Sequence, residues 1–71
     1  MSDKEKISIV EEILELEPNS LTLDSILSDY SEWDSLAIIS VLTYFEGELG
    51  ISLTPKQVKE FITVSDIVKI M

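Results

Sequence analysis

The residue whose type and position could support chemistry is Ser35, in the run Glu32-Trp33-Asp34-Ser35-Leu36. Aspartate is a preferred N-cap residue, so Asp34 predicts that Ser35 is the first residue of a helix. A hydroxyl at that position points outward at the positive end of the helix dipole, where an attached phosphate is stabilised. The spacing therefore predicts an exposed site at Ser35 that suits a phosphate-linked group.

The chain has neither cysteine nor histidine. It therefore lacks the usual nucleophile, the usual general base near neutral pH and the commonest metal ligand. Ser35 has no neighbouring histidine or lysine that would activate its hydroxyl. The acids around it, Asp29, Glu32 and Asp34, lack the spacing and the loop glycine of an EF-hand. We expect no enzymatic activity and no bound metal.

Fourteen acidic residues against five basic ones give a formal net charge of −9. This charge argues against binding to nucleic acid or to anionic membranes. It favours protein partners with basic patches, although acidity also serves solubility alone. No stretch is long enough to span a bilayer, and the segment after residues 1–6 is amphipathic, unlike a signal peptide. We expect a cytoplasmic monomer.

The first predicted helix covers residues 3–16. Ser2 and Glu5 have the spacing of a capping box, and Pro18 prevents the helix from continuing. Its apolar residues recur at helical spacing and predict a core-facing stripe: Ile7, Val10, Ile13 and Leu14. Its acidic residues fall on the opposite face: Glu11, Glu12 and Glu15.

Residues 19–33 predict a long ordered loop. The segment is rich in Ser, Asp and Asn, but it carries too many large apolar residues for a flexible linker. Leu23, Ile26 and Leu27 are spaced to form a short helical turn that docks into the core. A loop of this length in a small domain is usually either functional or evidence of a misassigned element.

The second predicted helix runs from Ser35 to about Leu49. Trp33 and Ile38 have the spacing of a hydrophobic staple, and Gly50 suits the left-handed residue that ends a helix. The core stripe is predicted to comprise Ile38, Val41, Leu42, Phe45 and Leu49. A strand over residues 37–42 is the alternative, because Ile and Val favour strands.

Two further helices follow. Thr54, Pro55 and Gln57 predict a capped start for a short helix that reaches about Phe61, and residues 63–66 predict another start. Together, these helices predict an all-α fold in one domain, residues 1–71. We expect a small antiparallel four-helix bundle with three main helices, one short helix and a long first loop.

An Asp-Ser-Leu tripeptide at Asp34-Ser35-Leu36 is by itself typical of any helix start. Here the tripeptide begins the central helix of a small acidic helical chain, after a long first loop. With these features combined, the chain resembles the acyl carrier proteins, and the resemblance extends from the first helix to Val68. The resemblance implies that Ser35 carries a 4′-phosphopantetheine arm, which holds acyl groups as thioesters. It implies a phosphopantetheinyl transferase, using coenzyme A and Mg²⁺, and acyl-handling enzymes as partners, with Asp34 orienting the transfer.

The resemblance also implies a partner surface and an acyl pocket. The partner surface would comprise Leu36, Ala37, Ile39, Ser40, Thr43 and Glu46, and it is more apolar than in carriers of bacterial fatty acid synthesis. The acyl pocket would lie among Val41, Leu42, Phe45, Leu53, Phe61 and Ile62. The Glu-Trp-Asp-Ser-Leu form is similar to discrete carriers of dedicated biosynthetic pathways. An aminoacyl or D-alanyl carrier and a non-catalytic helical interaction module are the alternatives.

Overall fold

The structure is a computed structural model that describes residues 2–71, so the predicted domain includes one residue, Met1, outside the described residues. Its α-helices are α1 (Asp3–Ile13), α2 (Ser35–Leu49), α3 (Pro55–Lys59) and α4 (Val64–Val68). A short 3₁₀ helix, η1 (Leu27–Asp29), interrupts the long loop. Within residues 2–71 there is no strand, apart from an isolated antiparallel bridge. The all-α prediction is therefore confirmed, including a helix over residues 37–42.

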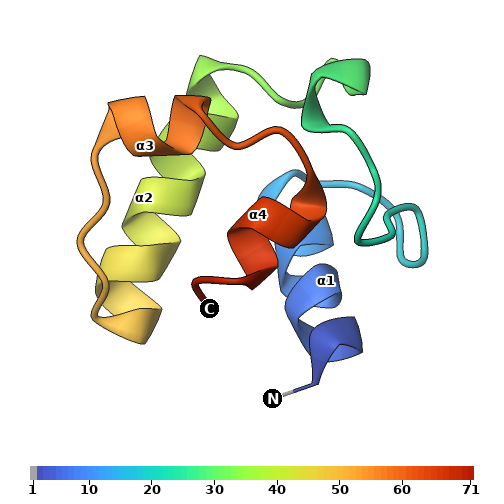
Figure 1. The fold of residues 1–71 in the computed structure, drawn as a ribbon, viewed down its shortest axis with the longest axis horizontal. Helices are drawn as coiled ribbons and strands as arrows, with labels where there is room; N and C mark the ends of the chain where they lie inside the picture. Colours follow the sequence, from blue (N-terminus) through green and yellow to red (C-terminus); the bar gives the residue numbers. More distant parts are fainter. Residues whose placement is uncertain (1) are drawn as a thin grey trace.

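The helices differ from the prediction in length. Only α1 and α2 are long, whereas α3 and α4 have 5 residues each, so the expectation of three main helices is wrong. In Figure 1, α1 (blue) and α2 (green to yellow) run in opposite directions. The two pack together, with α3 against α2 and α4 against α1. The antiparallel bundle arrangement itself stays a prediction.

Local capping explains where most helices begin. Ser2 and Glu5 form the predicted capping box of α1, and Thr54 and Gln57 form that of α3, with Pro55 as its first residue. At α4 the Asp66 carboxylate accepts hydrogen bonds from the backbone N–H groups of Ile62 (2.8 Å) and Thr63 (3.1 Å). These two bonds lower the pKa of Asp66. Each cap satisfies backbone donors that a helix start leaves without partners.

Helix α1 ends three residues earlier than predicted. Glu15 adopts a left-handed conformation with φ of 58°, and its N–H donates to the carbonyl of Glu12 at 3.1 Å. The N–H of Leu16 donates to the carbonyl of Glu11 at 2.8 Å. This pair of bonds is a Schellman motif, which usually employs glycine at the left-handed position. The chain therefore turns at Glu15 rather than continuing to Pro18.

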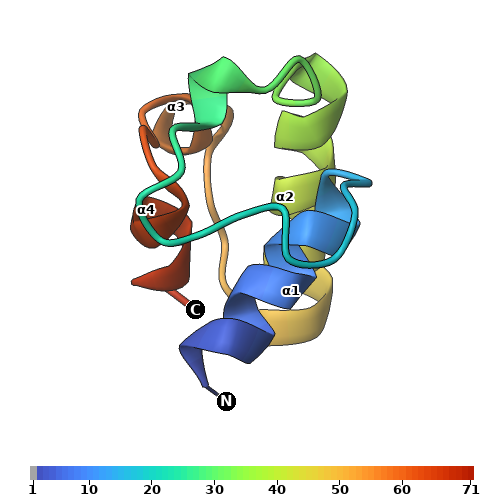
Figure 2. The ribbon, with the colours of Figure 1, turned by 90° about the vertical axis from the view of Figure 1, so that its right-hand side faces the viewer.

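The long loop is tied to the rest of the fold by backbone hydrogen bonds. Leu27 N–H donates to the Ile62 carbonyl (2.9 Å), Val64 N–H to the Ser25 carbonyl (3.0 Å), and Ser65 N–H to the Leu23 carbonyl (3.0 Å). Figure 2 shows the loop crossing in front of the molecule from α1 toward α4. The loop is therefore ordered, as the sequence predicted.

Side chains of the loop fill part of the core. Leu21 and Leu27 are buried and Leu23 is half-buried, but Ile26 is exposed, so its predicted docking is wrong. Ile26 instead lies in the backbone bridge with Thr63. Residues of the loop and of all four α-helices share one apolar core: Val10, Leu14, Leu21, Leu27, Ala37, Val41, Phe45, Val58, Val64, Ile67 and Val68.

Candidate functional site

The N-terminus of α2 places Ser35 as the sequence predicted. Asp34 is extended, with φ of −128° and ψ of −170°, and its Oδ1 accepts a hydrogen bond from the backbone N–H of Ala37 at 3.0 Å. The first intrahelical bond runs from the Ile38 N–H to the Asp34 carbonyl at 3.1 Å. Ser35 is therefore the first helical residue, and its side chain is exposed.

The segment before Ser35 is held in place by its own turns. The N–H of Trp33 donates to the Tyr30 carbonyl and the N–H of Asp34 donates to the Glu32 carbonyl, each at 3.0 Å. The Trp33 side chain is half-buried and packs against the core, as does Ile38. Packing of Trp33 against the core anchors the end of the loop, so the Asp34 cap and the backbone of Ser35 have a defined position.

The predicted partner surface is only partly exposed. Leu36 and Ile39 are 70% and 58% exposed, and Thr43 and Glu46 are exposed as well. Ser40 is half-buried and donates its hydroxyl hydrogen to the Leu36 carbonyl at 3.0 Å. Ala37 is only 5% exposed, so its predicted place on the outer face is wrong. Ala37 belongs to the core because it faces inward beside Val41, one helical turn further on.

The predicted acyl pocket combines packed core residues with two residues that line a surface cleft beside α3, Leu53 and Phe61. Val41 and Phe45 are fully buried, and Leu42, Leu53 and Phe61 are half-buried against the same core. Ile62 is 65% exposed, so its predicted place in the interior is wrong. The backbone of Ile62 explains this, because its N–H and carbonyl bind Asp66 and Leu27 while its side chain points to solvent. An acyl chain that reached Val41 and Phe45 would have to displace packed side chains.

The surface of residues 2–71 includes two clefts near these residues. The first, of about 140 Å³, lies between the end of α1 and the start of α2 and is lined by Ile13, Leu14, Glu15, Glu32, Asp34, Leu36, Ala37 and Ser40. The second, of about 260 Å³, lies beside α3 and is lined by Leu53, Gln57, Glu60, Phe61 and Ile70. Neither is lined by the buried residues Val41 and Phe45.

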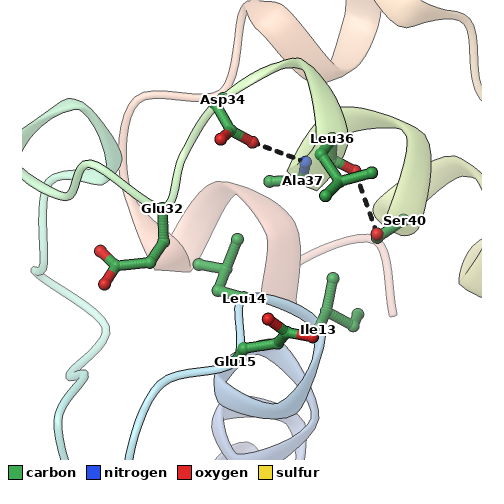
Figure 3. Close-up of a pocket in the computed structure, with 8 residues that line it drawn as sticks. All are labelled: Ile13, Leu14, Glu15, Glu32, Asp34, Leu36, Ala37 and Ser40. Atoms are coloured by element: carbon green, nitrogen blue, oxygen red, sulfur yellow. Dashed lines mark hydrogen bonds between the residues drawn. The ribbon is translucent and has the colours of Figure 1, made fainter.

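Figure 3 shows how the first cleft is built. Asp34, Leu36 and Ala37 line one side, and Ile13 at the end of α1 lines the other together with Leu14 and Glu15 from the turn that follows. Sequence reasoning missed this cleft, because it depends on α1 ending at Ile13. A left-handed glutamate leaves no pattern in the sequence, so no signal indicated that Glu15 would lie opposite the start of α2.

No metal site accompanies these residues: across residues 2–71 the structure has no group of three or more acidic residues placed to hold an ion. Nor does any helix in that range combine the length and the apolar character needed to cross a bilayer. The described site thus consists of an exposed serine hydroxyl, a capped helix start, an apolar outer face and an acidic cleft.

Comparison with known proteins adds one match. The family model described as "phosphopantetheine attachment site" matches residues 7–71. Neither the curated proteins nor the solved structures include a match to this chain. Because the matched segment covers nearly the whole chain, the protein belongs to the phosphopantetheine attachment-site family of carrier proteins, whose members bear a 4′-phosphopantetheine prosthetic group.

Proposed function

We propose that this protein is an acyl carrier protein whose prosthetic arm is attached to Ser35. The observation that carries the proposal is the exposed Ser35 hydroxyl at the first position of α2, directly after the Asp34 cap. Ser35 lies inside the segment that matches the family. The arm suits this position, because an exposed hydroxyl at a helix N-terminus accepts a phosphodiester without displacing any packed side chain.

Ser35 acts as an acceptor in a reaction catalysed by a separate phosphopantetheinyl transferase. Its Oγ forms a bond to phosphorus as the diphosphate bond of coenzyme A breaks. The adenosine bisphosphate leaves with that electron pair, and the hydroxyl proton passes to the transferase or to water. Asp34 keeps the helix start, and with it the hydroxyl, in one orientation. The attached arm supplies the thiol that this cysteine-free chain lacks.

The partner surface is the outer face of α2 near Ser35. Leu36 and Ile39 expose large apolar side chains there, and Thr43 and Glu46 continue the same face. Ser40 contributes less, because it is half-buried. Exposed apolar side chains favour contacts that depend little on charge, which supports acyl-handling enzymes of a dedicated biosynthetic pathway as partners.

Intact-mass measurement tests the attachment. Wild-type protein incubated with coenzyme A, Mg²⁺ and a broad-specificity transferase should gain one phosphopantetheine, and Ser35→Ala should gain none. Ser31→Ala is the matched control, because Ser31 is also exposed and lies four positions earlier, and it should be modified like the wild type. An unmodified wild type, under conditions that load another carrier protein, would contradict the proposal.

A second measurement addresses the cargo. The loaded protein is offered to acyl-activating and to amino-acid-activating enzymes, and intact mass identifies the group that is transferred. Acylation supports the proposed role. Exclusive transfer of an amino acid would instead identify an aminoacyl carrier that uses the same serine. A chain that accepts no arm at all would be an interaction module.

A further inference from the structure

Side chains join the two ends of the long loop. Its first residues are held from α1, because the buried Glu11 carboxylate accepts a hydrogen bond from the Leu21 N–H at 3.0 Å. Near its end, the Tyr30 carbonyl accepts a hydrogen bond from the Trp33 N–H at 3.0 Å. The Tyr30 hydroxyl in turn donates to the Ser20 carbonyl at 3.4 Å. Tyr30 therefore connects the end of the loop with the start that Glu11 holds.

The contact made by the Tyr30 hydroxyl bypasses the middle of the loop. Residues 23–27 bond to residues 62–65 at the start of α4, so they are held from a different part of the fold. Ser20 and Tyr30 are 10 positions apart, and the Tyr30 side chain spans them directly. The ring of Tyr30 is half-buried and packs against the core, which restricts where its hydroxyl lies. The start of the loop thus contacts its end through Tyr30.

The end of the loop leads directly to Ser35. The Asp34 N–H donates to the Glu32 carbonyl at 3.0 Å, and the Asp34 carboxylate caps α2 through the Ala37 N–H, also at 3.0 Å. Ser35 itself is exposed, so the segment before it determines where its hydroxyl is presented. Efficient group transfer requires the attacking atom to be held close to one position. Loss of order in residues 30–34 therefore lowers the fraction of carrier molecules that are ready to react.

We propose that Glu11 and Tyr30 are positioning residues for the modification of Ser35. Glu11 lies in α1 and Tyr30 precedes the serine by five positions, so both act through the loop rather than on the reacting atoms. Their hydrogen bonds order the loop, and the ordered loop presents the hydroxyl to the transferase. This inference rests on the proposed function of Ser35 and extends it, because residues outside α2 then determine how fast the arm is attached.

Steady-state kinetics of loading separate positioning from binding. Glu11→Ala leaves the exposed face of α2 unchanged, so we expect the KM for the carrier to stay constant while kcat falls about two- to fivefold. Glu11→Gln keeps an oxygen that can accept the Leu21 N–H, so it should recover most of the wild-type kcat. The inference is wrong if kcat is unchanged in Glu11→Ala, or if Glu11→Gln loses as much of it.

A core substitution separates positioning from loss of stability. Val58 is fully buried but belongs to α3, outside the loop. Val58→Ala should therefore destabilise the fold without removing any hydrogen bond of the loop. At a temperature at which circular dichroism shows every variant folded, Val58→Ala should keep the wild-type kcat. A fall in kcat equal to that of Glu11→Ala would mean that stability alone controls loading, and the inference would be lost.

Hydrogen exchange of backbone amides tests the Tyr30 hydroxyl without turnover. Tyr30→Phe removes the hydroxyl and keeps the packed ring. Tyr44→Phe is the matched control, because Tyr44 is also half-buried against the core but lies on α2. We expect Tyr30→Phe to speed exchange of the Trp33 and Asp34 amides about two- to fivefold and Tyr44→Phe to leave both unchanged. Equal exchange rates in the two variants would exclude a role for the Tyr30 hydroxyl.

The same measurement on Glu11→Ala tests whether the two ends of the loop are coupled. Exchange should become faster at Leu21, which loses its acceptor, and also at Trp33 and Asp34. Faster exchange confined to Leu21 would overturn the inference even if wild-type Ser35 is loaded normally. Failure to load wild-type Ser35 would instead overturn the proposed function.

Discussion

The carboxylate of Glu11 accepts a hydrogen bond from the backbone N–H of Leu21, with Oε2 and the nitrogen 3.0 Å apart. Both residues are buried, and Glu11 is only 4% exposed although its neighbours Glu12 and Glu15 face solvent. A backbone N–H buried without a partner is costly. Glu11 therefore fixes the start of the long loop against α1.

Glu11→Ala should destabilise the fold. The change leaves the buried Leu21 N–H without its acceptor, which typically costs about 1–3 kcal/mol. Urea unfolding of Glu11→Ala beside the exposed control Glu12→Ala measures the difference, and the control should change stability by less than about 0.5 kcal/mol. Equal effects for the two variants would mean that the hydrogen bond does not hold the loop.

Phe45→Ala should unfold most of the protein. Phe45 is fully buried in the core, and truncation of a buried Phe costs ~3–5 kcal/mol. A domain of this size has only about 5 kcal/mol of stability in total. Circular dichroism and intact-mass loading should show a largely disordered chain that is a poor transferase substrate with Ser35 intact. Thr43→Ala, on the exposed side of α2, is the control and should remain folded and loadable.

Ser35→Ala should leave stability almost unchanged. The Ser35 side chain is exposed, and the cap bond from Asp34 to the Ala37 N–H does not involve its hydroxyl. Thermal unfolding of the wild type and the variant should give melting temperatures within a few degrees of each other. A loss comparable to that of Phe45→Ala would show that the serine has a structural role.

Ile39→Ala should weaken binding to a cognate acyl-handling enzyme. Ile39 exposes 58% of its surface beside Leu36, and apolar contacts persist when salt screens exposed charges. Isothermal titration at low and moderate salt should show a lower affinity for the variant under both conditions. A wild-type complex that disappears at moderate salt would show instead that binding depends on charge.

Asp66 should contribute stability that is lost in acid. Hydrogen bonds from the Ile62 and Thr63 N–H groups lower its pKa in the folded protein. Its contribution is therefore complete above the ordinary carboxyl pKa of about 3.9 and is lost as pH falls through the lower folded value. Melting temperatures of wild type and Asp66→Asn should differ at pH 6 and converge in acid, as pH falls through the lowered pKa of Asp66. A difference in melting temperature that does not change with pH would show that the stabilisation does not come from the ionised Asp66 carboxylate.

Features encoded in neighbouring residues could be predicted from the sequence. The Asp34 cap, the Pro55 start and the left-handed Gly50, with φ of 66°, are each determined by local backbone chemistry. The same local signals placed Ser35 at the start of α2. Asp34 and Gly50 also mark the two ends of α2 correctly, because they satisfy its terminal backbone groups.

Features that depend on distant partners could not be predicted. Glu11 has the spacing of a solvent-facing residue, but it is buried because Leu21 supplies a donor ten positions later. Ala37 and Ile39 both belong to a nearly continuous apolar run, so periodicity alone does not show which one faces the core. The exposure of Ile62 likewise follows from backbone bonds to the long loop, which no local pattern reveals.

The backbone bonds between residues 23–27 and 62–65 also bear on how the chain folds as it is made. The ribosome synthesises the loop long before its partners at the start of α4, so a nascent chain lacks the groups that hold the loop. Until those residues emerge, Leu21 and Leu27 have only part of their final core to bury against. These bonds between the loop and the start of α4 can therefore form only after residues 62–65 have been synthesised, and the loop that leads to Ser35 is held in place only then.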